Sequence, residues 1–322
     1  MYRNKSFHWK AVLCCGLLSA SISVTAQTDI DGLMMDKNFF CVGATAGKSS
    51  WKNYWEGTLK RDNLNLGTVS NSYAMLMGVY GITDKLNVLF ALPYIKTKAS
   101  VGNMAGQKGL QDLSLFVKWQ AYDKHLGKGH LKAMATAGYS LPTSNYSPDL
   151  LPLSIGMRSK NLTMRLIADY ERGNWFATAS ASYVYRSNVT LNRNTYYTTE
   201  MHYSNKVEMP NAAQWNIRAG YRSSTWIIEA IADRWNTLGG FDITRNNMPF
   251  VSNNMEATSV GLHVKYDTDF VNGLSFVADA STIIAGRNMG QSTGFSGGIF
   301  YIFDFSKKIP AAPAAASSSP TK

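Results

Sequence analysis

The stretch "YGITDKLNVLFALPYIKTK" (Tyr80–Lys98) places an apolar side chain at every second position until it reaches a proline. Because successive side chains of an extended chain point to opposite sides, this alternation predicts a β-strand with one apolar face. The side chains on that face are Leu86, Val88, Phe90, Leu92 and Tyr94. Such a face lies either against the core of a soluble sandwich or against the hydrocarbon of a membrane, and the rest of the sequence separates these two possibilities.

The same alternation appears on both sides of short turns further along the chain. In "AAQWNIRAGYRSSTWIIEAIADRW" (212–235), apolar and polar residues alternate before and after Ser223-Ser224. A tight turn at these two serines would set Arg218 directly opposite Glu229, on the polar face of the hairpin. This pattern predicts antiparallel hairpins with one apolar and one polar face.

The connections between the predicted strands alternate in length. Short ones such as "GITDK", "RSS" and "DTDFVNG" are separated by long ones such as "TKASVGNMAGQKG" and "LPTSNYSPDLLPLSIGMRSK". Short turns at one end and long loops at the other are typical of outer-membrane barrels, whereas a Greek-key sandwich has no reason to keep this order. From Phe39 to Phe305 we count about twelve strands. The predicted fold is therefore an all-β, antiparallel, up-and-down transmembrane β-barrel, with its apolar faces toward lipid.

The ends of the chain differ in composition from this central part. A basic start, an apolar stretch and a small-residue site at Val24-Thr25-Ala26 predict a cleaved signal peptide. The last residues are rich in Pro, Ala and Ser and cannot form a core. The expected organisation is a signal peptide (1–26), a short periplasmic N-terminal segment (27–38), the barrel (39–305) and a disordered tail (306–322).

Two stretches resemble a known family. "YGITDKLNVLFALPYI" (80–95) and "GLQDLSLFVKW" (109–119) are similar to a family of Gram-negative outer-membrane proteins named for the meta-cleavage pathway of phenol degradation. The resemblance implies an outer-membrane location and passive uptake of small aromatic or other hydrophobic compounds. "SGGIFYIF" (296–303) resembles the signal read by the bacterial barrel-assembly machinery. It implies that this machinery is a partner.

The polar faces predict the charged part of a lumen. Charges of both signs are expected to pair across strands, and the alternative is a charged eyelet that selects solutes. Twelve strands lie between the filled eight-stranded barrel and the open sixteen-stranded channel, so an open lumen and a closed one both remain possible. The polar lumen candidates are Arg165, Asp169, Arg218, Arg222, Glu229, Asp233, His263, Lys265 and Asp279.

The opening stretch predicts an apolar part of the same lumen. A turn at Thr83-Asp84 would set Val79 opposite Val88 on the lipid face, which leaves mostly apolar side chains on the inner face. This wall would serve either as a path for a hydrophobic solute or as a seat for N-terminal residues or loops. Its candidate residues are Leu76, Leu89, Ala91 and Pro93.

Other functions find little support in the sequence. The formal charge is +11, but the basic residues are scattered, so we expect no nucleic-acid partner. No histidine accompanies a serine in a hydrolase motif or matches a metal-binding spacing, so we expect neither an enzyme nor a metal or other cofactor. The expected partners are outer-membrane lipid, lipopolysaccharide and a small hydrophobic solute, with the chain as a monomer. A structural or surface-interaction barrel with a closed lumen is the alternative function.

Overall fold

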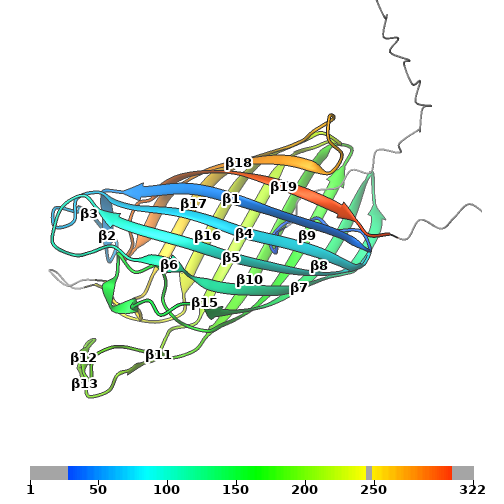
Figure 1. The fold of residues 1–322 in the computed structure, drawn as a ribbon. Coiled ribbons are helices and arrows are strands. Elements are labelled where there is room, and N and C mark those ends of the chain that lie inside the picture. The colour runs from blue at the N-terminus through cyan, green and yellow to red at the C-terminus, as the bar shows by residue number, and fades with distance from the viewer. Residues whose placement is uncertain (1–27, 244–248, 307–322) are drawn as a thin grey trace, which may run out of the picture.

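Twelve long strands close into an antiparallel barrel in the computed structural model, which describes residues 28–243 and 249–306 (Figure 1). The predicted signal peptide and nearly all of the predicted tail lie outside these residues. The wall consists of β1 (Phe39–Trp51), β4 (Val69–Thr83), β5 (Leu86–Ala99), β7 (Asp112–Leu126), β8 (Gly129–Pro142), β9 (Asn161–Arg172), β10 (Trp175–Arg186), β15 (Ala212–Arg222), β16 (Trp226–Thr237), β17 (Glu256–Asp267), β18 (Leu274–Arg287) and β19 (Thr293–Asp304).

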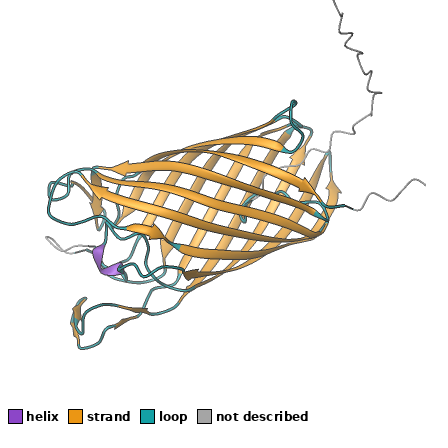
Figure 2. Cartoon of the chain, viewed as in Figure 1, coloured by secondary structure: helices purple, strands orange, loops and turns teal. Residues whose placement is uncertain are grey.

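Small elements lie in the long connections, at the end of the barrel opposite Phe39, where the first strand begins, and Asp304, where the last one ends (Figures 1 and 2). They are β2 (Asn53–Glu56), β3 (Leu59–Asp62), β6 (Lys108–Leu110), β11 (Val189–Thr190), β12 (Tyr196–Tyr197), β13 (Met201–His202), β14 (Lys206–Val207) and the helical turn η1 (Pro148–Leu150). Within the described ranges, no helix is long and apolar enough to cross a bilayer. Because short turns face the periplasm and long loops face outward in barrels of this kind, the loop end is the extracellular end.

The first and last strands pair with each other and so close the wall. Cys41 on β1 pairs with Ile302 on β19 on one side and with Val79 on β4 on the other. A closed wall has no free strand edge, so every strand can satisfy its backbone groups without water. The predicted antiparallel barrel of about twelve strands is confirmed.

The outer face of the wall is apolar. Leu166, Ile217 and Leu262 expose 71%, 60% and 59% of their surface on the outside of the barrel. Val88 and Tyr94, from the stretch that begins the sequence argument, are also exposed there. Apolar side chains in the core of a water-soluble protein are far less exposed than these. Exposed apolar side chains in this position are expected on a strand that faces lipid.

The hairpin at Ser223-Ser224 has a longer turn than predicted. Arg222 pairs with Ile227, so four residues form the loop, and Arg218 lies opposite Ile231 rather than Glu229. The predicted pairing is therefore wrong by two residues. A shift of two leaves every side chain on its predicted face, because strand faces alternate with a period of two.

The hairpin at Thr83-Asp84 departs from the prediction by one residue, which matters more. A bulge between Gly81 and Thr83 inserts an extra residue into β4, so Val79 pairs with Leu89. A one-residue shift moves the side chains of one strand to the opposite face. Leu76, predicted to line the lumen, is 48% exposed on the lipid side.

Candidate lumen site

The segment 28–38, expected to be a short periplasmic stretch, runs into the barrel. Its anchor is Lys118 on β7, whose side chain is completely buried. The Lys118 ammonium donates to the carbonyl oxygens of Thr28 (3.0 Å) and Asp31 (2.8 Å) and to Oδ1 of Asp31 (2.8 Å). A buried ammonium is stable only with such partners, so the segment and the wall depend on each other.

A second cation on the wall faces the same segment. Nε of Arg165 lies 3.7 Å from Oδ2 of Asp29. Next to these contacts the segment lies very close to the wall, since a Cβ added to Gly32 would lie 2.2 Å from the carboxyl carbon of Asp169. A glycine is therefore required where the segment approaches the inner face of β9.

The surroundings shift the pKa values of the two aspartates of the segment in opposite directions. Burial opposes the ionisation of Asp31, but the Lys118 ammonium and its hydrogen bonds outweigh burial and lower the pKa of Asp31. Burial raises the pKa of Asp29, and the more distant Arg165 guanidinium offsets this only in part. Asp31 is thus the charge that holds the segment.

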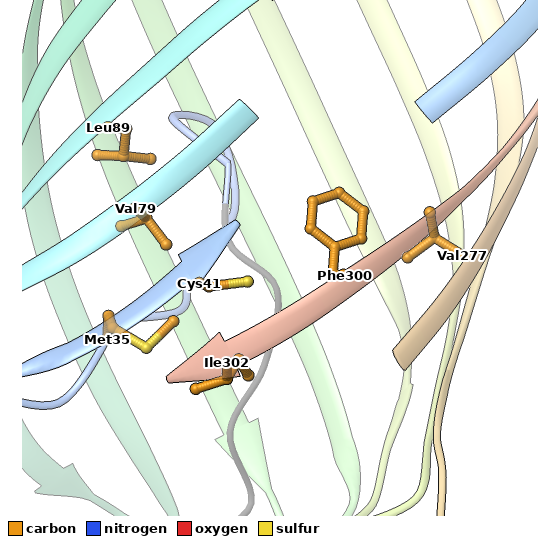
Figure 3. Close-up of a cluster of buried hydrophobic side chains, with 7 residues drawn as sticks. All are labelled: Met35, Cys41, Val79, Leu89, Val277, Phe300 and Ile302. Carbon is orange, nitrogen blue, oxygen red and sulfur yellow. The ribbon is translucent and has the colours of Figure 1, made fainter. Parts of the chain in front are cut away.

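An apolar cluster completes the seat of the segment. Met35 belongs to a buried cluster with side chains of β1, β4, β5, β18 and β19 on the inside of the wall (Figure 3). The other members of this cluster are Cys41, Val79, Leu89, Val277, Phe300 and Ile302. Of the two roles considered for the apolar wall, a seat for N-terminal residues is therefore realised at Leu89.

Charged side chains on the opposite part of the wall pair with one another. Arg222 contacts Glu171 and lies 3.5 Å from Oδ2 of Asp169. Its guanidinium also lies 4.0 Å from the ring centroid of Phe176, close enough for a cation–π contact. Asp169 is fully buried and accepts a hydrogen bond from Thr178 at 2.5 Å.

A neighbouring group links β15 and β16. Nη1 of Arg218 lies 2.6 Å from Oε1 of Glu229, so the expected ion pair forms across a diagonal despite the shifted register. Asp233 accepts from the side-chain amides of Gln214 (2.8 Å) and Asn216 (3.0 Å). Because these side chains already bond to one another, few of their donors and acceptors are left for a polar solute.

Two further pairs lie on β17 and β18. Nδ1 of His263 lies 2.6 Å from Oδ1 of Asp279. Nζ of Lys265 lies 2.6 and 2.7 Å from the two oxygens of Asp267. Each of these side chains reaches the inner face of the barrel, and each contacts a polar partner there.

A cavity of about 550 Å³ lies inside the barrel. Tyr73, Met75 and Met77 of β4, Thr45 and Ser49 of β1 and Phe300 of β19 line one side of it. The other side and the floor are lined by Arg218, Arg222, Glu229, His263 and Asp279 of the wall and by Thr28, Asp31 and Leu33 of the N-terminal segment. The cavity has the size of a small-molecule site.

The loop between β8 and β9 (143–160) narrows the extracellular end of the lumen. Leu153 is completely buried and packs against Val69 on the inner face of β4. The hydroxyl of Tyr146 donates to Oδ1 of Asp112 at 2.6 Å. The N-terminal segment and this loop therefore constrict the lumen from opposite ends.

The placement of the predicted lumen residues follows from strand alternation. All nine polar candidates lie on the inner face. Leu89, Ala91 and Pro93 also lie there, since they alternate with exposed residues of β5, whereas Leu76 points to lipid. The β4 residues of the cavity were missed because they depend on the bulge, and the acidic segment was missed because its contacts lie far away in the sequence. Among the described residues, no three His, Cys, Asp or Glu side chains come together to hold a metal ion.

Two comparisons with known proteins find no match. No family model matches the sequence. No curated protein matches it either. The predicted resemblance to the meta-pathway family therefore stays a prediction.

The solved structures include similar barrels. The COG4313 outer membrane channel from Pseudomonas putida F1 is similar with a TM-score of 0.65 at 13% identity, over 87% of this chain and 100% of that one. The translocator domain of the autotransporter NalP from Neisseria meningitidis gives 0.44 at 13% identity, over 84% and 89% of the chains. The TodX monoaromatic hydrocarbon channel (deltaS2S3 mutant) gives 0.42 at 10% identity, over 89% and 94%. At these identities the first similarity shows the fold of an outer-membrane channel and nothing finer, and the other two carry no argument about function.

Proposed function

We propose that this protein is a passive, non-catalytic outer-membrane channel for small hydrophobic or aromatic compounds. The observation that carries the proposal is the lining of the cavity. Met75, Met77 and Phe300 present apolar surface to the cavity, Arg218 and Glu229 already pair with each other, and His263 already contacts Asp279. A solute that fills this space gains apolar and aromatic contact more readily than new hydrogen bonds.

Passage requires that the constrictions move. The N-terminal segment lies on the periplasmic side of the cavity, and its anchor is the contact between Lys118 and Asp31. The loop 143–160 lies on the extracellular side. A channel of this design would conduct intermittently, as the segment or the loop leaves its seat.

The test compares solutes of two kinds. The mature protein is refolded into liposomes, and the influx of phenol and of a small sugar is measured against protein-free liposomes. Faster entry of phenol alone supports the proposal. Met75→Ser combined with Met77→Ser should then slow phenol and leave the sugar unaffected, because both side chains face the cavity. Faster sugar entry would instead indicate a general pore.

A structural or surface-interaction barrel with a closed lumen is the second candidate. The observation that favours it is the same pair of constrictions, since buried Leu153 and buried Lys118 hold both in place. If neither solute enters faster than into protein-free liposomes, this second function is the better one. Removal of an extracellular loop should then abolish binding of a surface partner.

A further inference from the structure

The outer face of the barrel carries a group of lysines near its extracellular end. They lie on β1, β5 and β6. Because β4 pairs with both β1 and β5, and β6 pairs with β5, these strands form one continuous part of the wall (Figure 1). All four side chains are exposed. The lysine group consists of Lys48, Lys96, Lys98 and Lys108.

The strand register brings these lysines to nearly one height. Lys48 pairs with Ser72, Ser72 pairs with Lys96, and Lys96 pairs with Lys108. With neighbouring strands about 4.8 Å apart, this row spans roughly 14 Å across four strands. Lys98 lies two residues closer to the loops, on the same face.

The lysine group lacks an acidic partner. Within residues 28–243 and 249–306, none of the four takes part in an ion pair. Lys96 and Lys108 lie directly opposite each other, an arrangement of like charges that destabilises a sheet. By contrast, Arg234, an exposed cation elsewhere on the barrel, lies 2.8 Å from Glu256. The uncompensated row indicates that an anion from outside the chain neutralises it.

The surface next to the lysine group is apolar. Tyr94 and Leu110 form the next outward-facing pair toward the membrane centre, exposed by 44% and 40%. Leu76 and Val88 continue this surface further down. An anion bound here would have acyl chains directly beside it, which describes a phosphorylated lipid rather than a free ion.

We propose that Lys48, Lys96, Lys98 and Lys108 form a binding site for the phosphorylated glycolipid of the outer leaflet. The ammonium groups pair with its phosphates, and its acyl chains lie on the surface around Tyr94 and Leu110. The extracellular position of the row selects this lipid over the phospholipids of the inner leaflet. The site is on the outside of the wall and does not depend on whether the lumen conducts.

The test measures binding of bisphosphorylated lipid A to the refolded barrel in detergent, by native mass spectrometry. Lys96→Gln combined with Lys108→Gln should weaken binding by about 25-fold, at about fivefold for each lysine. The matched control, Lys85→Gln with Lys128→Gln, makes the same charge change at the periplasmic turns and should leave binding unchanged. Dephosphorylated lipid A should bind the wild-type barrel at least as weakly as the double variant binds the intact lipid, because it offers no phosphate to any of the four lysines.

Several results would overturn the proposal. They are equal binding by wild type and the double variant, an equal loss in the periplasmic control, and equal binding of phosphatidylglycerol. Displacement by millimolar inorganic phosphate as effectively as by lipid A would assign the lysines to free anions instead. If the double variant fails to shift on a gel between boiled and unboiled samples, it is not folded. Lys98→Gln then serves alone, with an expected loss of about fivefold.

Discussion

Replacing Asp31 by asparagine should release the N-terminal segment from the lumen. The Lys118 ammonium is fully buried and has its only charged partner within the described residues in Asp31, at 2.8 Å. Asparagine preserves the shape and one oxygen but removes the charge that neutralises the ammonium. Leaving one member of a buried ion pair without its partner costs about 3–5 kcal/mol. At about 1.4 kcal/mol for each factor of ten, the ratio of docked to released segment should fall by about two to three and a half orders of magnitude.

Single-channel recording in planar bilayers measures this ratio as the fraction of time spent in the larger conductance state. Asp36→Asn is the matched control, because Asp36 lies in the same segment, is exposed, and changes by the same charge. The variant that combines Asp31→Asn with Lys118→Met should return toward wild type, since no unpaired charge then remains buried. Wild-type behaviour of Asp31→Asn, or an equal effect of Asp36→Asn, would refute the role assigned to this ion pair.

Three further predictions test other parts of the argument. Gly32→Val should release the segment as Asp31→Asn does, because the new side chain would overlap the carboxyl group of Asp169; normal recordings from this variant would contradict this close approach. The lowered pKa of Asp31 means that its contribution to docking is complete above about pH 3.8 and is lost as the pH falls further, whereas the raised pKa of Asp29 makes protonation favour docking. Lowering the pH from about 7 to about 5.5 should therefore not increase the fraction of time in the larger conductance state. A steep increase over that interval would disagree with these pKa shifts. Leu76→Lys should destabilise the barrel by about 2–4 kcal/mol in urea refolding into vesicles, whereas Met75→Lys should be tolerated, and the reverse order would show that the bulge in β4 is misplaced.

The turns explain where the sequence predicts the wall correctly and where it does not. At Ser223-Ser224 the predicted turn is two residues too short, and the faces of both strands are still right, because the error is even. At Thr83-Asp84 the error is one residue, and Leu76 moves from the lumen to lipid. The sequence of β4 does not reveal the bulge, because both faces of this strand carry apolar side chains. The predicted register and the observed one therefore look equally suitable.

The sequence alone determined that this chain forms a barrel of about twelve antiparallel strands, and which face of most strands is polar. These properties depend on a period of two residues and on the order of short and long connections, both of which can be read locally. The tertiary structure alone decided that an acidic segment enters the lumen. The contact that holds it joins Lys118 to Asp31 across 87 residues of chain, and the lumen that receives it exists only when β1 closes on β19. Contacts between segments so far apart in the sequence leave no periodic trace, so they become visible only in the folded barrel.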